Sequence, residues 1–281
     1  MMAPVVMRRV GRDALISASL MIAAGCGGRR ATPAAAAARP EPPAITDGRS
    51  LVSAMRQKYT AVWFKTLSFT QNNTLYLTRG GATNSQWREH IAVPGKLRID
   101  YLPLTQRSGV LFDGSRVHTF DNGRAIDVQP GVNAQLLVTS DVYALPVERS
   151  AQLLDSLGFD LSKLRRDTWE GQPVYVVGAT AGDSTSSQLW VDTDKLVAVR
   201  FIQKERRGTR DIVTDVRLAK FSDFGGVPIA TEVAQYRDGR LVFRELLVDV
   251  KVNDPIPDAT FDPTKWVAAQ PKQPAGEGKQ R

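Results

Sequence analysis

Apolar and polar residues alternate with a period of two through most of the chain after its first sixty residues. Leu97, Ile99 and Tyr101 show this spacing with the charged residues Arg98 and Asp100 between them. Val197, Val199 and Phe201 repeat the spacing, although the other face of that stretch is partly apolar. Similar stretches cover residues 212–221, 229–236 and 241–252, and a change of apolar phase in the last one predicts a bulge near 244–245. Because successive side chains of a strand point to opposite faces, these stretches predict half-buried β-strands.

Short turn motifs separate the alternating stretches. They lie at residues 113–114, 121–123, 170–171, 192–194 and 238–239, and they read Asp-Gly, Asp-Asn-Gly, Glu-Gly, Asp-Thr-Asp and Asp-Gly. Such motifs form tight hairpins, which join antiparallel strands. We count roughly ten to twelve strands, and a sheet of that size curls or splits. The sequence therefore predicts a mainly β fold with a few helices, built on an unclosed, strongly curved antiparallel β-barrel.

Two regions have the period of a helix instead. Asp47 is suited to cap a helix over residues 48–59, where apolar residues recur at three- and four-residue spacing. The stretch 132–164 contains two further apolar helices. These helices either plug one end of the barrel or lie over its concave apolar face as a lid, and the periodicity alone does not choose. The leucines that would form such a lid are Leu136, Leu137, Leu153 and Leu154.

The first 25 residues have the layout of a secretory signal peptide, with arginines, an apolar run and then small residues. The apolar run is shorter than the about 20 residues that a membrane-spanning helix needs. Cys26, the only cysteine in the chain, follows Ala-Ala-Gly, which resembles the bacterial lipobox. We therefore predict a lipid anchor on Cys26; the alternative is an ordinary secretory signal with an incidental cysteine. One thiol excludes an internal disulfide and a cysteine cluster for zinc.

Composition divides the rest of the chain into three parts. Residues 26–46 are rich in Ala, Pro and Arg and predict a flexible tether, and residues 47–266 carry the periodic pattern of the folded domain. Residues 267–281 form a basic flexible tail, which is either solvated or in contact with anionic headgroups. The formal net charge of +8 lies partly in the signal and in the C-terminal segment, so it is weak support for nucleic-acid binding.

From residue 47 to residue 263 the chain resembles the LolA-like superfamily of periplasmic lipoprotein carriers, lipoprotein receptors and lipid-binding lipoproteins. The resemblance rests on the order of four motifs, with Asn253 and Phe261 after them: VPGKLRIDY at 93–101, LFDGSRVHTFD at 111–121, LWVD at 189–192 and GVP at 226–228. It implies an unclosed barrel of about eleven strands with helices over an apolar cavity. In the family's carrier an arginine that bonds to the lid precedes the motif proline, whereas this chain has Val93 there.

The resemblance implies reversible binding of lipid or of lipoprotein acyl chains, in lipoprotein sorting or lipid transfer, with no bond made or broken. With the anchor on Cys26, we expect a monomeric lipoprotein of the cell envelope, at the outer membrane and facing the periplasm. One alternative is an envelope-stress sensor module that binds a protein partner, and another is a structural lipoprotein whose barrel is filled by its own side chains. The residues that we expect to line the cavity are Leu97, Ile99, Tyr101, Val197, Val199 and Phe201.

The sequence lacks the motifs of common catalytic and metal-binding sites. His90 and His118 fall in predicted strands without HExxH spacing, and no GxSxG, GxGxxG or Walker motif occurs. Aspartates at 192, 194 and 223 read as turn formers because no calcium-binding loop surrounds them. No basic helix or aromatic platform indicates nucleic-acid binding. We therefore expect no catalysis, no metal, no cofactor and no nucleic-acid partner.

Overall fold

A computed structural model of the chain describes residues 44–270. The predicted signal peptide, the lipidation site at Cys26, and most of the predicted tether and tail lie outside the described residues. Within the described part, no helix is long and apolar enough to cross a membrane.

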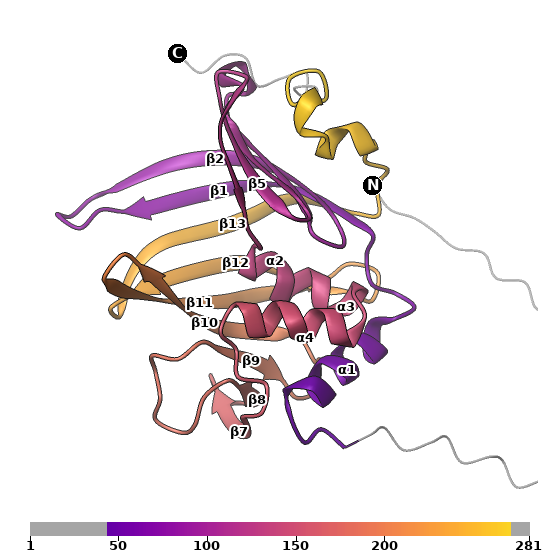
Figure 1. Ribbon diagram of the computed structural model, residues 1–281, viewed down its shortest axis with the longest axis vertical. Coiled ribbons are helices and arrows are strands. Elements are labelled where there is room, and N and C mark those ends of the chain that lie inside the picture. The colour runs from indigo at the N-terminus through magenta and orange to yellow at the C-terminus, as the bar shows by residue number, and fades with distance from the viewer. Residues whose placement is uncertain (1–43, 271–281) are drawn as a thin grey trace, which may run out of the picture. The chain divides into compact units, whose positions relative to one another are not determined.

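Within residues 44–270, thirteen antiparallel strands form one open sheet, whose first and last strands each pair with one neighbour (Figure 1). Its order is β6-β5-β4-β3-β2-β1-β13-β12-β11-β10-β9-β8-β7, so the two halves of the chain meet where β1 pairs with β13. The mainly β, antiparallel and unclosed fold predicted from the sequence is confirmed, with one strand more than the largest number counted. The strands are β1 (Thr66–Tyr76), β2 (Ala82–Ala92), β3 (Lys96–Tyr101), β4 (Gly109–Asp113), β5 (Arg116–Asp121), β6 (Arg124–Pro130), β7 (Leu164–Trp169), β8 (Gln172–Val177), β9 (Gln188–Asp192), β10 (Ala198–Arg207), β11 (Arg210–Asp223), β12 (Pro228–Arg237) and β13 (Arg240–Val252).

All five predicted turn motifs join neighbouring antiparallel strands. In the turn between β5 and β6, Asn122 and Gly123 both have positive φ angles, of 48° and 80°, as a tight hairpin turn requires. The predicted bulge at 244–245 is wrong, because Arg244 and Glu245 pair regularly with both neighbouring strands. The register of β13 shifts on either side of them instead, once within 241–243 and once within 248–251.

The predicted N-terminal helix is confirmed as α1 (Gly48–Tyr59), with Asp47 as its N-cap. The Ser50 amide donates to Asp47 Oδ1 over 2.7 Å, which satisfies one of the amides that a helix start leaves free. The second helical region divides into α2 (Ala134–Leu136), the π-helix η2 (Leu137–Asp141), α3 (Val142–Ala144) and α4 (Val147–Ser156). Three short 3₁₀ turns complete the fold: η1 (Leu104–Gln106), η3 (Asp258–Phe261) and η4 (Pro263–Lys265).

The main hydrophobic core lies between the helices and β8–β12. Buried side chains of α1, the 134–144 segment and α4 pack there against strand residues such as Val191 and Val216. Figure 1 shows these helices on one side of that part of the sheet. A second core cluster joins Leu136 of α2 to apolar residues of β1, β2 and β3. The helical segment from α2 to α4 therefore contacts strands from both halves of the sheet.

A separate small cluster lies around the C-terminal turns, where Phe261 and Trp266 pack with Leu111 of β4 and Phe120 of β5. The rings of Phe120 and Trp266 stack in parallel at a centroid distance of 4.2 Å. This segment covers Arg98 and Asp100, whose side chains on β3 have no solvent exposure. The charged side of β3 is thus buried, although alternation alone indicates a solvent-facing side there.

Candidate functional site

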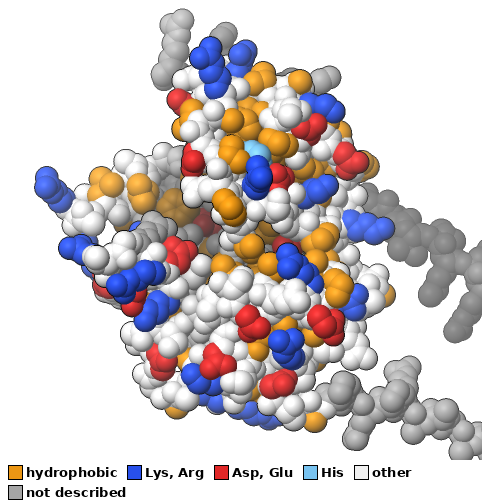
Figure 2. All heavy atoms as spheres, viewed as in Figure 1, with side chains coloured by type: hydrophobic (Ala, Val, Ile, Leu, Met, Phe, Trp, Pro, Cys, Tyr) orange, Lys and Arg blue, Asp and Glu red, His pale blue; other side chains and the backbone are white. Residues whose placement is uncertain are grey.

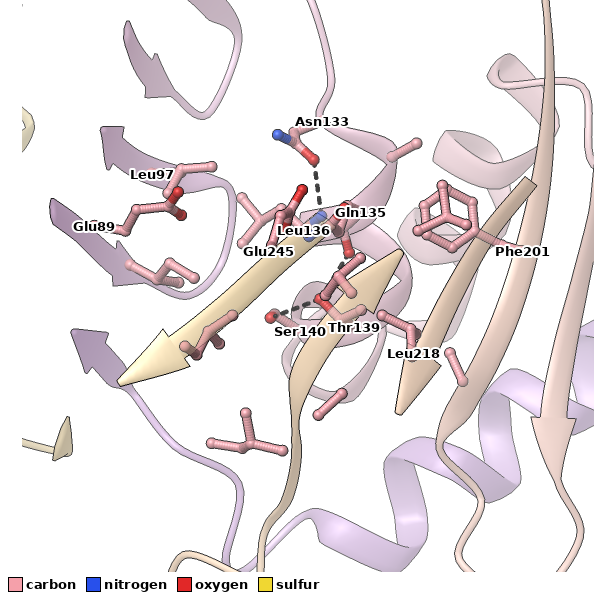
Figure 3. A pocket seen from close by; sticks show the side chains of 18 of the residues that line it. Glu89, Leu97, Asn133, Gln135, Leu136, Thr139, Ser140, Phe201, Leu218 and Glu245 are labelled. Atoms are coloured by element: carbon pink, nitrogen blue, oxygen red, sulfur yellow. Dashed lines mark hydrogen bonds between the residues drawn. The ribbon is translucent and has the colours of Figure 1, made fainter. Parts of the chain in front are cut away.

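A cavity of about 530 Å³ lies between the α2–η2 segment and the sheet (Figure 3). Strands from both halves contribute to it, because β1–β4 and β10–β13 all supply lining residues. The face seen in Figure 2 is hollowed between the far ends of the β1–β2 and β10–β11 hairpins. The cavity exceeds the roughly 300 Å³ at which ligand pockets begin. The alternative of a barrel filled by its own side chains is therefore wrong.

The cavity wall changes from apolar to polar along the strands. On β1 the inward-facing residues run from Leu67 and Phe69 to Gln71, and on β2 Ile91 is followed inward by Glu89. Since Leu67 pairs with Ile91 and Phe69 with Glu89, the two strands change character at nearly the same level. The cavity therefore has an apolar end and a polar end, as a ligand with a hydrocarbon chain and a polar group requires.

Two carboxyl groups lie in the polar part. Glu89 of β2 is 6% exposed and Glu245 of β13 is 5% exposed. Gln135 and Gln235 donate their side-chain amides to Glu245 over 3.2 and 3.0 Å, one to each carboxylate oxygen. Burial raises the pKa of Glu245 to about 7. Burial, and then the charge of Glu245, raise the pKa of Glu89 well above its usual range.

Side chains of the 133–144 segment border the cavity and are fixed from several sides. Asn133 accepts a hydrogen bond from the Leu136 amide over 2.9 Å, which caps α2 next to the cavity. Asp141 accepts one from the Gly95 amide over 2.9 Å, and its pKa rises to about 6 because it is buried. Tyr143 stacks on Trp63 with ring centroids 3.8 Å apart. The contact between η2 and the 93–95 turn thus runs through Gly95 and Asp141, and does not need an arginine at position 93.

Four of the six expected lining residues border the cavity, namely Leu97, Ile99, Val197 and Phe201. Tyr101 does not line it; its ring lies 5.3 Å from that of Trp87, which does. Val199 packs with Trp190 and its neighbours in a cluster that is separate from the cavity. The reason is a register shift, since Ala198 pairs with Val191 and Arg200 with Trp190, which leaves Val199 as an extra residue.

The expected lid residues separate into two groups. Leu136 lines the cavity, whereas Leu137 and Leu154 are fully buried in the main core and Leu153 packs against that core from a half-buried position. Most of this region therefore packs into the core, while residues of α2 and η2 and Tyr143 of α3 border the cavity. Of the four expected lid leucines, Leu136 is the one that lines the cavity, and a lid function of this region stays a prediction.

The sequence pattern did not indicate the polar lining residues, among them Gln71, Glu89, Gln235 and Glu245. A signal for Glu89 existed, because Trp87, Glu89 and Ile91 have the spacing of one strand face and all three line the cavity. Glu245 gave no such signal, since the two register shifts of β13 obscure its face.

The two histidines lie on different strands, His90 on β2 and His118 on β5. His118 Nε2 lies 2.8 Å from Asp113 Oδ2, across the β4–β5 hairpin. His90 is mostly buried, and burial lowers its pKa to about 4. Among residues 44–270, no cluster of three His, Cys, Asp or Glu side chains is placed to hold a metal ion.

Comparison with known proteins finds similar solved structures, but no matching family model or curated protein. A domain described as an outer membrane lipoprotein-sorting protein from Vibrio parahaemolyticus superimposes with a TM-score of 0.55 and 10% identity, over 78% of this chain and 97% of that domain. A DUF1329 family protein from Desulfovibrio piger gives a TM-score of 0.54 and 13% identity, over 79% and 98% of the two chains.

The LolA superfamily protein NE2245 from Nitrosomonas europaea gives a TM-score of 0.50 and 14% identity, over 78% of this chain and 98% of that one. At these identities the comparison concerns the fold. Together with the thirteen-stranded open sheet, it confirms the resemblance drawn from the sequence motifs: the chain has the fold of the LolA-like superfamily.

Proposed function

We propose that this protein binds lipid, or the acyl chains of lipoproteins, in the cavity between the sheet and α2–η2, and that it does so without chemical change to the ligand. The observation that carries the proposal is a ligand-sized cavity with an apolar end, on a fold shared with a domain described as lipoprotein-sorting. In this proposal the sheet curves around the ligand, and α2 and η2 act as its cover.

The energetics favour such a ligand. Each methylene moved out of water contributes about 0.8 kcal/mol, so a twelve-carbon chain contributes about 10 kcal/mol before the costs of association. Those costs are of similar size, at about 4–15 kcal/mol. The costs offset much of this gain, which favours reversible binding, as a transfer protein requires.

We further propose that Cys26 carries the lipid anchor after removal of residues 1–25, and that residues 26–46 tether the folded domain, 47–266, to the outer membrane on its periplasmic side. The domain would act as a monomer. Mass spectrometry of the protein from its host tests the anchor, because a thioether-linked diacylglycerol on Cys26 adds a defined mass that a Cys26→Ser variant lacks.

The test of lipid binding is displacement of an apolar fluorescent probe by dodecanol, together with native mass spectrometry of the purified protein. The cavity-filling variant Ala230→Trp changes a residue of β12 that lines the cavity, and it should weaken binding at least about tenfold. The matched control Ala234→Trp changes the same strand on its other side, away from the lining residues, and should bind like the wild type.

Failure of the wild type to bind any probe or chain, with no lipid co-purifying, would refute the proposal. Recovery of a single protein partner in the absence of lipid, from a variant with a filled cavity, would support the sensor alternative instead.

A further inference from the structure

Among the side chains that the structure describes, the two buried carboxyl groups of the cavity have no basic partner. Glu245 receives its two hydrogen bonds from neutral amides, and among the described side chains burial and the charge of Glu245, but no hydrogen bond, act on Glu89. The charged lining residues are Glu89, Glu205, Glu245 and Arg237. Arg237 is exposed at the end of β12, so the buried part of the wall carries acidic groups alone.

A pair of this kind is costly in the empty protein. A buried carboxylate needs a cation or several hydrogen-bond donors, and the charge of Glu245 adds to the cost at Glu89. Fold stability does not explain the pair, because an apolar or amide side chain would fit the same strand positions at lower cost. Figure 3 shows Glu89 and Glu245 pointing into the cavity from β2 and β13, on opposite sides of β1.

Aromatic rings lie on the same strands as the carboxyl groups. Trp87 is two residues from Glu89 on β2, and Phe243 is two residues from Glu245 on β13. Both line the cavity, and their ring centroids are 5.7 Å apart. Carboxylates together with aromatic faces form the usual environment of a bound ammonium group, which donates to the first and is attracted by the second.

We propose that the ligand of this cavity is an amphiphile with a primary ammonium group at its polar end, held by Glu89 and Glu245 beside Trp87 and Phe243. The proposal rests on the proposed function and names its ligand class. The hydrocarbon chain lies along the apolar end, toward Leu67 and Ile91, and the ammonium supplies the donors that Glu89 lacks. A free fatty acid brings a third carboxylate to the same place and is therefore disfavoured.

The test measures displacement of an apolar fluorescent probe from the purified protein at pH 7.4 by three twelve-carbon ligands: dodecylammonium, dodecanol and dodecanoate. In the wild type, dodecylammonium should bind about tenfold more tightly than dodecanol, and dodecanoate about tenfold more weakly, as expected for charge-assisted hydrogen bonds. In the double variant E89Q/E245Q the three affinities should converge to within about threefold.

The control E148Q/E170Q removes two exposed carboxylates, and so the same formal charge, from outside the cavity. It should keep the wild-type order of affinities. If the double variant fails to fold, as judged by its thermal unfolding, the single variant E89Q replaces it and should lose most of the preference for the amine.

The outcomes separate the two proposals. If dodecanol binds and the wild type shows no preference for the amine, or if the preference persists in E89Q/E245Q, the ammonium site is refuted while lipid binding stands. If none of the three ligands binds, lipid binding itself fails, and the ammonium site with it.

Two natural sources carry an ammonium next to acyl chains, and native mass spectrometry distinguishes them. One arm compares phosphatidylethanolamine with phosphatidylglycerol. The other compares a synthetic diacylated cysteine peptide that has a free α-amine with its N-acylated form. Preferential binding in either arm identifies that source, and no preference in both arms contradicts the proposal.

Discussion

The buried ion pair on β3 allows a sharp test of how the C-terminal segment is attached. Arg98 donates to both carboxylate oxygens of Asp100 over 2.8 and 2.9 Å, and to the carbonyl oxygens of Thr260 and Trp266 over 3.3 and 2.7 Å. The Trp266 ring lies over the guanidinium at 4.0 Å. One arginine therefore joins the sheet to a segment that lies more than 160 positions later in the chain.

The substitution Asp100→Asn removes the negative charge and leaves Arg98 in place. Because both side chains are fully buried, water cannot compensate the remaining charge. Breaking a buried pair in this way costs about 3–5 kcal/mol, a large part of the about 5–15 kcal/mol that stabilises a typical domain. For a domain of this size, 1 kcal/mol corresponds to about 2–4 °C in Tm, so we expect a Tm lower by about 6–20 °C.

Thermal unfolding followed by circular dichroism measures the effect, with two further variants for comparison. Arg49→Ala removes an ion pair with Asp155 in which both side chains are about half exposed, and it should cost less than about 1 kcal/mol. The double variant Arg98→Met with Asp100→Leu removes both buried charges, and it should be more stable than Asp100→Asn alone. A Tm for Asp100→Asn within 2 °C of the wild type would falsify the view that this pair is desolvated and anchors the C-terminal segment.

Three further predictions concern the cavity and the sheet. Burial raises the pKa of Glu245 from its ordinary 4.5 to about 7, so the folded chain binds more protons than the unfolded chain between these pH values. The free energy of unfolding therefore falls as pH rises through that window. Glu245→Gln should reduce this fall, measured by thermal unfolding at pH 5 and pH 8. Gly178→Ala should lower Tm more than Gly171→Ala. Both glycines have positive φ, but a Cβ would meet backbone atoms at position 178 and nothing at position 171, so equal decreases of Tm would contradict the close backbone approach at Gly178. Ile99→Thr should weaken binding of dodecanol about fourfold, the equivalent of one methylene. Val199→Thr should change the affinity for dodecanol less than twofold, and a larger loss for Val199→Thr than for Ile99→Thr would contradict the register of β10.

The parts of the fold that the sequence predicts correctly depend on local signals. The start of α1 follows from an N-cap side chain and an apolar spacing within twelve residues, and the hairpins follow from turn motifs of two or three residues. In each case the physical cause lies within one element or one turn. Strand faces are predictable as far as the register is regular, which is why Leu97 and Ile99 lie on the cavity wall.

The wrong predictions concern strand residues whose surroundings are set by another part of the chain. Val199 leaves the cavity because β9 and β10 pair with a shift that period-two counting does not detect. Arg98 and Asp100 are buried because the segment 258–266 covers them, and no feature of β3 itself indicates that cover. Alternation distinguishes two sides of a strand, but it does not tell which side another segment covers.

Assembly of the candidate site depends on one long-range pairing. Glu89 lies on β2 and Glu245 on β13, and β1 pairs with both strands, so that Phe69 is opposite Glu89 and Asn73 is opposite Glu245. The acidic groups therefore approach one another only when the first strand of the sheet joins the last. Their mutual repulsion opposes that pairing, and an ammonium ligand would relieve it. Binding of such a ligand should consequently stabilise the β1–β13 junction itself, which links occupancy of the cavity to the stability of the whole sheet.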